Sequence, residues 1–224
     1  MLRSSLKAVR APMPVAAARA SAIARGMATS SDLATINLHE SSFEGYQLEL
    51  LPELTFTTEK ETLLKMYKDM VVIRRMEMAS DALYKAKKIR GFCHLSVGQE
   101  AIAVGIEYAI TPEDTIITSY RCHGFAHMRG ALVKSVLAEL MGRRSGVSYG
   151  KGGSMHMFAP GFYGGNGIVG AQVPLGAGLA FAHKYRGEQK ATFALYGDGA
   201  SNPGQGSESH KMAKLWSLPF IFAC

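Results

Sequence analysis

The sequence predicts an α/β fold, in which a parallel sheet carries helices on both faces. Two observations lead to this fold class. Short β-branched or apolar runs at residues 115–118, 192–196 and 219–223 alternate with longer segments of helical period. Alternating strands and helices form right-handed βαβ units, and these units build parallel sheets. Ligands of such sheets bind outside the carboxyl ends of the strands, so a site is expected there.

The helices around the first strand follow from their apolar spacing. A capping box from Thr58 to Glu61 is expected to start a long helix, which Gly91 can end. One face of this helix is apolar and comprises Leu63, Met66, Met70, Ile73 and Met76. A second helix is expected from about residue 99 to 110, and a third, after the first strand, from about 132 to 141.

Residues 142–170 are rich in glycine and separate the third helix from the rest of the chain. A connection of this length in a compact domain is usually functional or disordered. Because the stretch also holds aromatic and methionine side chains, a ligand-lining loop is favoured over a plain linker. A helix of small residues is expected at 171–184, closed by Gly187, and another at 204–216, with Asn202 as its cap.

The first 31 residues differ in composition from the rest of the chain. They contain five Lys and Arg residues and no acid, and they account for most of the net charge of +7. Such leaders are typical of organellar transit peptides, the alternative being a disordered basic terminus. The remaining chain shows no basic patch for nucleic acid and no apolar run that could span a bilayer. The three cysteines lack CxxC or zinc spacing, which indicates free thiols.

Polar residues follow two of the predicted strands. The run at residues 115–118 ends in Ser119, Tyr120 and Arg121, and Asp198, between two glycines, follows residues 192–196. Carboxylate oxygen is a ligand that Mg²⁺ prefers, and magnesium sites are usually completed by substrate phosphates. An arginine fork and a helix N-terminus both suit phosphate groups. The two strand ends therefore predict a site for a ligand that carries phosphate and magnesium.

Four segments carry a resemblance to a known family. They read "MEMASDALYKAKKIRGFCHLSVGQEAIAVGIE", "DTIITSYRCHGF", "GRRSGVSYGKGGSMHMFAPGFYGGNGIVGAQVPLGAGLAFA" and "YGDGASNPGQ". Over about residues 51–218 the chain resembles the α subunits of the E1 component of mitochondrial pyruvate dehydrogenases. The "GFCH" and "GKGGSMH" stretches are closer to the pyruvate enzymes than to their branched-chain relatives. The resemblance implies the thiamine-diphosphate-binding fold, with thiamine diphosphate and Mg²⁺ as cofactors.

The resemblance also implies site residues. Asp198 matches the first magnesium ligand, and His94 matches a substrate-pocket histidine, whereas His123 and His156 are weaker candidates for the cleft. The matching contacts to thiamine diphosphate are Tyr120, Arg121, Gly167, Val169, Gly199 and Ala200.

The activity that the resemblance implies is oxidative decarboxylation of pyruvate, with transfer of the acetyl group to a lipoyl group on the E2 component. The implied assembly is a heterotetramer with E1 β subunits, and the carboxylate that activates the aminopyrimidine comes from the β subunit. We expect a protein of the mitochondrial matrix, cleaved near Arg25. The regions expected are a transit peptide at 1–27, an arm at 28–56 and a partial thiamine-diphosphate-binding domain at 57–224.

Two departures from the family pattern leave alternatives open. The family's magnesium motif continues to an Asn-Asn pair, which is due just after Cys224, so the printed sequence is expected to supply half of the metal shell and to be inactive alone. The helix at 204–216 also lacks expected apolar residues. The chain is then either an E1 α chain or a catalytically dead paralogue that binds or competes for the β subunit. A different thiamine-diphosphate enzyme is disfavoured by the "GFCH" and "GGSMH" segments.

Overall fold

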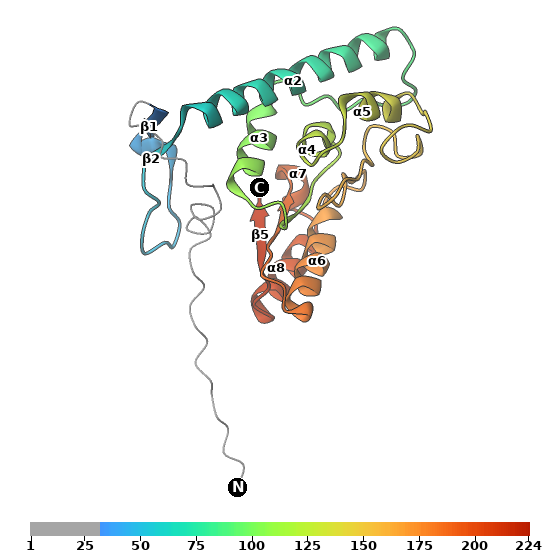
Figure 1. The fold of residues 1–224 in the computed structure, drawn as a ribbon. Helices are drawn as coiled ribbons and strands as arrows, with labels where there is room; N and C mark the ends of the chain where they lie inside the picture. The colour runs from blue at the N-terminus through green and yellow to red at the C-terminus, as the bar shows by residue number, and fades with distance from the viewer. Residues whose placement is uncertain (1–31) are drawn as a thin grey trace. The chain divides into compact units, whose positions relative to one another are not determined.

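The computed structural model describes residues 32–224 (Figure 1). The chain divides after Glu59 into two compact units, of which Lys60–Cys224 is the larger. The predicted transit peptide at 1–27 and its cleavage near Arg25 lie outside the described residues. No helix within residues 32–224 combines the length and the apolar character needed to cross a membrane.

The smaller unit contains an antiparallel pair of strands. Strand β1 (Leu33–Asn37) pairs with β2 (Thr55–Glu59), with Leu33 opposite Glu59, and a short 3-10 helix, η2 (Glu40–Ser42), lies in the connection. Thr58 pairs with Ala34 inside this ladder. The predicted capping box at Thr58 is therefore wrong, because the next helix begins only at Lys60.

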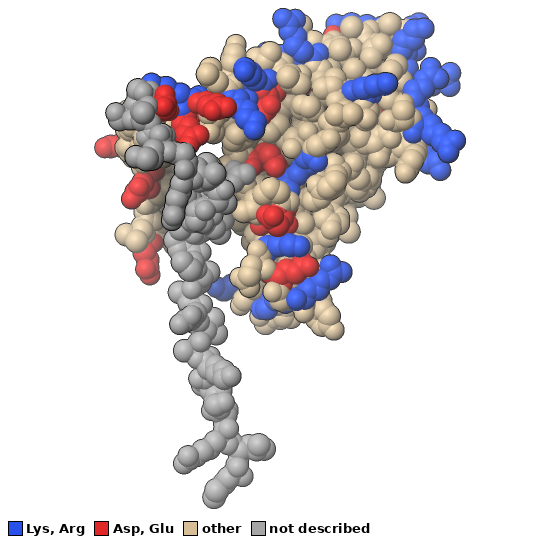
Figure 2. All heavy atoms as spheres, viewed as in Figure 1, with Lys and Arg blue, Asp and Glu red and all other residues tan. Residues whose placement is uncertain are grey.

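Helix α2 (Lys60–Lys85) buries the predicted apolar face, with Ile73 and Met76 in the core. The helix ends at Lys85, six residues before Gly91, so the predicted stop at Gly91 is wrong. Lys87 adopts a left-handed backbone conformation (φ 57°), and the amides of residues 87 and 88 bond back to the carbonyls of the last turn. Lys and Arg side chains gather where α2 ends (Figure 2), which suits the negative end of the helix dipole.

Three shorter helices pack around α2. Helices α3 (Glu100–Ala109) and α5 (Val133–Leu140) confirm the predicted second and third helices. Helix α4 (His123–Met128) was not predicted, because six residues are too few to show a helical period. Gly124 lets α4 approach closely, since a Cβ there would lie 3.3 Å from the Ala103 Cβ of α3.

The sheet is parallel and three-stranded, in the order β3 (Thr115–Ile117), β4 (Thr192–Leu195) and β5 (Phe220–Ala223). Helices α6 (Gln172–Arg186), α7 (Asp198–Ser201) and α8 (Gly204–Leu215) belong to the same half of the chain (Figure 1). On one face Leu195 joins the core formed with α2–α5, and on the other Ala194 and Phe220 meet Gly176 of α6. This confirms the predicted α/β class with helices on both faces.

Helix α8 forms over all twelve residues despite its unusual composition, and it packs on α6. Its N-cap is Pro203, so the predicted cap at Asn202 is wrong. The side-chain Nδ2 of Asn202 instead donates to the Asp198 carbonyl oxygen at 3.0 Å, which closes the last turn of α7.

The two central glycines of α6 should respond oppositely to alanine. A Cβ at Gly176 would lie 2.9 Å from the Phe220 ring, whereas a Cβ at Gly178 would meet nothing within 4 Å. We expect Gly176→Ala to lower the free energy of unfolding by about 1–3 kcal/mol through overpacking. Gly178→Ala should raise it by about 0.5–1 kcal/mol, because alanine loses less backbone entropy in a helix. Urea titration of both variants measures this, and equal effects would contradict the packing of α6 on the sheet.

Candidate functional site

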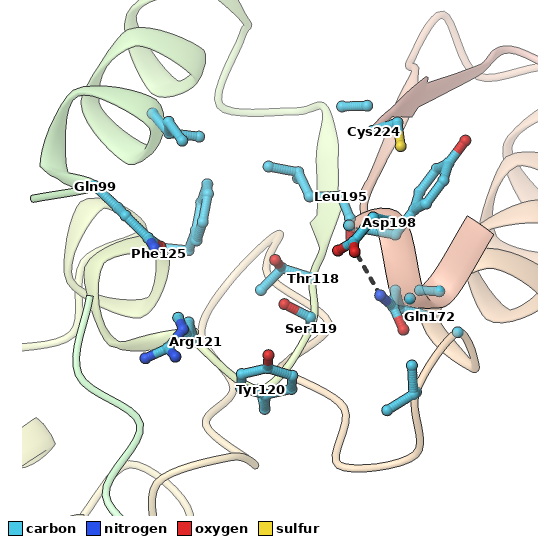
Figure 3. Close-up of a pocket in the computed structure, with 18 of the residues that line it drawn as sticks. Gln99, Thr118, Ser119, Tyr120, Arg121, Phe125, Gln172, Leu195, Asp198 and Cys224 are labelled. Atoms are coloured by element: carbon cyan, nitrogen blue, oxygen red, sulfur yellow. Dashed lines mark hydrogen bonds between the residues drawn. The ribbon is translucent and has the colours of Figure 1, made fainter. Parts of the chain in front are cut away.

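A cavity of about 610 Å³ opens at the carboxyl ends of the three parallel strands (Figure 3). Both predicted strand ends line it, together with the start of α6 and one side of α3 and α4. The polar and charged lining residues are Gln99, Thr118, Ser119, Tyr120, Arg121, Gln172, Tyr196 and Asp198. The expectation that the ends of residues 115–118 and 192–196 meet in one cleft is confirmed.

Arg121 and Asp198 lie on opposite sides of this cavity (Figure 3). Within residues 32–224 neither side chain forms an ion pair. The Arg121 guanidinium donates through Nη1 to the Leu95 carbonyl oxygen and lies 5.4 Å from the centre of the Tyr120 ring. Its other donors and the Asp198 carboxylate therefore present one positive and one negative charge to a ligand.

The turn after β4 exposes backbone to the cavity. Gly197, Asp198 and Gly199 are exposed, and a Cβ on either glycine would meet nothing within 4 Å. The Ala200 amide already donates to the Gly197 carbonyl oxygen at 3.0 Å, so it would have to share that hydrogen with a ligand. The turn is thus open to a large ligand at Gly197–Gly199 and more constrained at Ala200.

Gln172, at the start of α6, was missed by the sequence reasoning. Its Nε2 donates to the Leu195 carbonyl oxygen at 3.1 Å, and its buried Oε1 has no hydrogen-bond partner within the described part of the chain. A buried acceptor without a partner is costly and points to a missing water or ligand group. The helical spacing in the sequence could have indicated its burial, because Gln172 lies on the same buried face of α6 as Val173, Gly176 and Ala180.

Val169 borders the cavity, but its carbonyl oxygen accepts a hydrogen bond from Gln205 at 3.1 Å. Gly167 does not line the cavity, and a Cβ there would lie 3.3 Å from the ring of His156. The structure therefore brings Tyr120, Arg121 and the Asp198 turn together with Val169, and places Gly167 beside His156 instead.

His94 lies next to the cavity rather than in its lining. Its ring lies 4.5 Å from the ring of Tyr120 and 4.7 Å from that of Phe92. Burial lowers the pKa of His94, and the electrostatic influence of Arg121 and, to a smaller extent, of His123 lowers it further. A neutral imidazole is thereby favoured at the edge of the site.

His123 is not a cleft residue, because its side chain is fully buried between α2 and the glycine-rich loop, where it contacts Glu77 and Ser154. The neighbouring Cys122 is also buried, and burial raises the pKa of its thiol to about 12. A thiol with so high a pKa is a poor nucleophile. Neither residue therefore offers a reactive group to the cavity.

The glycine-rich loop at 142–170 contains no helix or strand, as predicted, but it is not loose. The buried carboxylate of Glu139 accepts hydrogen bonds from the amides of Ser148, Gly150, Gly152 and Gly153 at 2.7–3.0 Å. At Gly152 a Cβ would lie 1.8 Å from the His156 carbonyl oxygen, so only glycine fits there. The loop is thus shaped by one side chain of α5.

No group of three or more His, Cys, Asp or Glu side chains that could hold a metal occurs within residues 32–224. Asp198 is a single carboxylate at the cavity. One carboxylate is compatible with Mg²⁺, which takes few protein ligands and retains water or phosphate oxygens, so the role of Asp198 stays a prediction.

Comparison with known proteins identifies a family that this chain resembles. The family model described as "Dehydrogenase E1 component" matches residues 68–224. The "Pyruvate dehydrogenase E1 component subunit alpha, mitochondrial" of Saccharomyces cerevisiae is 76% identical over 87% of this chain and 46% of its own length. The protein of the same name from Schizosaccharomyces pombe is 64% identical over 84% of this chain and 46% of its own length.

A mammalian relative shows the same partial coverage. The "somatic form" of the E1 α subunit from Bos taurus is 58% identical over 80% of this chain and 46% of its own length. The chain thus spans about half the length of the curated relatives it matches. Since the family match covers well over half of the sequence and includes every residue of the cavity, the chain belongs to the dehydrogenase E1 component family.

Proposed function

We propose that this chain is the α subunit of a mitochondrial pyruvate dehydrogenase E1 component, which oxidatively decarboxylates pyruvate and passes the acetyl group to the lipoyl group of an E2 component. The relatives are named as α subunits of a pyruvate dehydrogenase E1 component, which supports the substrate and an assembly with a further subunit, proposed to be E1 β. The single observation that carries the proposal is the cavity at the strand ends, where Arg121 and Asp198 face each other without ion-pair partners in the described chain.

The residues of the cavity fit thiamine diphosphate with Mg²⁺. A diphosphate would provide a negatively charged partner for Arg121. A divalent cation would provide a positively charged partner for Asp198. Gly197 and Gly199 allow a bulky anion to approach the backbone. The orphaned Oε1 of Gln172 offers an acceptor to a donor group of the ligand or of a bound water.

When bound, thiamine diphosphate supplies a carbon nucleophile and then an electron sink for decarboxylation of a 2-oxo acid. The residues of this chain would hold and orient the reactants. Arg121 would bind the diphosphate with its free donors, and Asp198 would bind Mg²⁺. Neutral His94, packed against Tyr120, would form a hydrogen bond with the substrate, as donor or as acceptor.

We place this function in the mitochondrial matrix. The acid-free basic leader supports that location, and so do the relatives that are named mitochondrial. Fusion of residues 1–35 to a fluorescent reporter examines the leader directly, and a cytosolic reporter would contradict matrix import.

The experiment that tests the function uses the full-length protein together with its β partner. Release of carbon dioxide from pyruvate should require thiamine diphosphate and Mg²⁺, and 2-oxo acids with branched side chains should react poorly. A dead paralogue would bind the β subunit without catalysing this reaction, and that result would overturn the proposal.

Replacement of Arg121 should weaken cofactor binding. Arg121→Ala removes a charge-assisted bond of about 1.5–3 kcal/mol, so the Kd for thiamine diphosphate should rise about 10- to 150-fold. Calorimetric titration at saturating Mg²⁺ measures this. Arg186→Ala, at the exposed end of α6, is the matched control and should leave the Kd unchanged. An unchanged Kd in Arg121→Ala would remove Arg121 from the cofactor site.

A further inference from the structure

Three consecutive residues next to the cavity are each held by a different part of the fold, although their segment has no regular secondary structure. The His94 amide donates to Ser154 Oγ at 2.8 Å. The Leu95 carbonyl oxygen accepts from Arg121, and Ser96 Oγ donates to Glu77 at 3.0 Å. The position of the His94 ring therefore depends on bonds to distant residues rather than on a helix or strand.

Two of these anchors belong to one buried chain of polar groups. His123 Nδ1 lies 2.9 and 3.1 Å from the two carboxylate oxygens of Glu77, and its Nε2 lies 2.9 Å from Ser154 Oγ. Glu77 and His123 are fully buried, and Ser154 is 7% exposed. These buried polar groups connect α2, the start of α4 and the glycine-rich loop to the segment that carries His94.

Each polar group of this buried network has a partner within hydrogen-bond distance. The carboxylate of Glu77 can only accept, so Nδ1 of His123 donates to it. Ser154 Oγ accepts the amide hydrogen of His94 and lies within hydrogen-bond distance of Nε2 of His123, which is also 3.1 Å from the Ser154 carbonyl oxygen. Buried polar networks in which every group is satisfied make their surroundings rigid, and removal of one member leaves another unpaired.

Serine, histidine and a carboxylate in this order also activate nucleophiles in hydrolases. Here the hydroxyl of Ser154 is buried and receives the His94 amide, and Ser154 does not line the cavity. No substrate carbonyl can approach its Oγ in this arrangement. The geometry favours a structural tie over a reacting group.

We infer that Glu77, His123 and Ser154 are positioning residues, which hold the His94 ring against Tyr120 through the hydrogen bond from the His94 amide to Ser154 Oγ. The inference rests on the proposed function only in giving His94 a task beside the substrate. The tie itself is a property of the buried network.

Two serine-to-alanine variants separate this role from general stabilisation. Ser154→Ala removes the acceptor of the His94 amide, whereas Ser96→Ala removes a hydroxyl of similar burial from the same network and leaves that bond intact. In the assembled protein, hydrogen exchange at the His94 amide should speed up about 2- to 12-fold in Ser154→Ala, since one hydrogen bond is lost. In Ser96→Ala it should stay as in the wild type.

The same pair should differ in turnover. A misplaced His94 should lower kcat with pyruvate about 10- to 100-fold in Ser154→Ala, while the Kd for thiamine diphosphate changes little. Equal exchange at the His94 amide in the two variants would overturn the inference, and so would covalent labelling of Ser154 by a fluorophosphonate. If the wild type does not turn over pyruvate, the proposed function fails, and the exchange measurement still decides the inference.

A second pair covers the case in which Ser154→Ala does not fold. In His123→Gln the longer amide reaches the place of Nε2 and keeps a partner for Ser154, whereas in His123→Asn the shorter amide reaches only toward Glu77. Exchange at the His94 amide should therefore rise more in His123→Asn than in His123→Gln. The opposite order would contradict transmission through Ser154.

Discussion

Asp198→Ala should reduce kcat/KM for pyruvate by at least about 100-fold, because residues that merely orient a metal ligand already contribute 10- to 100-fold. The loss should come with loss of the Mg²⁺ dependence of cofactor binding. The fold should persist, since the Asp198 side chain forms no ion pair or hydrogen bond within residues 32–224 and only its backbone carbonyl is used by Ser201 and Asn202.

The measurement is a calorimetric titration of thiamine diphosphate at several Mg²⁺ concentrations, together with steady-state rates. Asp198→Asn is the matched control, because it keeps one oxygen ligand and removes the charge, and it should fall between the wild type and alanine. Wild-type Mg²⁺ dependence in Asp198→Ala would show that the metal is held elsewhere.

Glu139→Gln should be among the most destabilising isosteric changes in this chain. The carboxylate accepts four amide hydrogens, two on each oxygen. Glutamine keeps one accepting oxygen and turns the other into a donor, which leaves two partly buried amides unpaired. At about 1–3 kcal/mol for each, the free energy of unfolding should fall by about 2–6 kcal/mol, a large share of the 5–15 kcal/mol of a typical domain.

Urea unfolding measures this loss, and Glu113→Gln on the exposed surface is the control, expected to change stability by less than about 0.5 kcal/mol. Trypsin gives a local readout, because Arg143, Arg144 and Lys151 lie exposed in the loop. They should be cleaved faster in Glu139→Gln. Unaltered stability together with unaltered cleavage would mean that the carboxylate does not hold the loop.

The sequence was sufficient to predict the sheet and the place of the site. Tyr120 and Asp198 line one cavity because the carboxyl ends of parallel strands share one edge, and that follows from the order of apolar runs alone. The end of α2 was not predictable in the same way, because Lys87 takes the left-handed conformation that glycine usually takes. Helix α4 has only six residues, too few to show the helical repeat of apolar side chains in the sequence.

The buried acids were missed for a different physical reason. Glu77 and Glu139 look like ordinary polar positions of helices, and only the partners that tertiary structure brings to them reveal their burial. Helical spacing does indicate that Glu77 is buried, since it lies four residues after Ile73 on the apolar face of α2. The positions of Gly167 and His94 outside the cavity lining depend on loop conformation, for which the sequence has no periodic signal.

The contact between Glu139 and the loop has a consequence for how this region can diverge among species. All four of its hydrogen bonds go to backbone amides, so the shape of residues 148–153 depends on few of their side chains: the glycines where nothing larger fits, and Ser148, whose Oγ donates to the His156 carbonyl oxygen at 2.8 Å. An exposed position such as Lys151 can therefore accept substitutions without moving the backbone beside the cavity, whereas Tyr149, with φ 57°, favours residues that tolerate the left-handed conformation. Natural selection can adjust the outer surface of the loop, while a single inherited glutamate preserves its inner form.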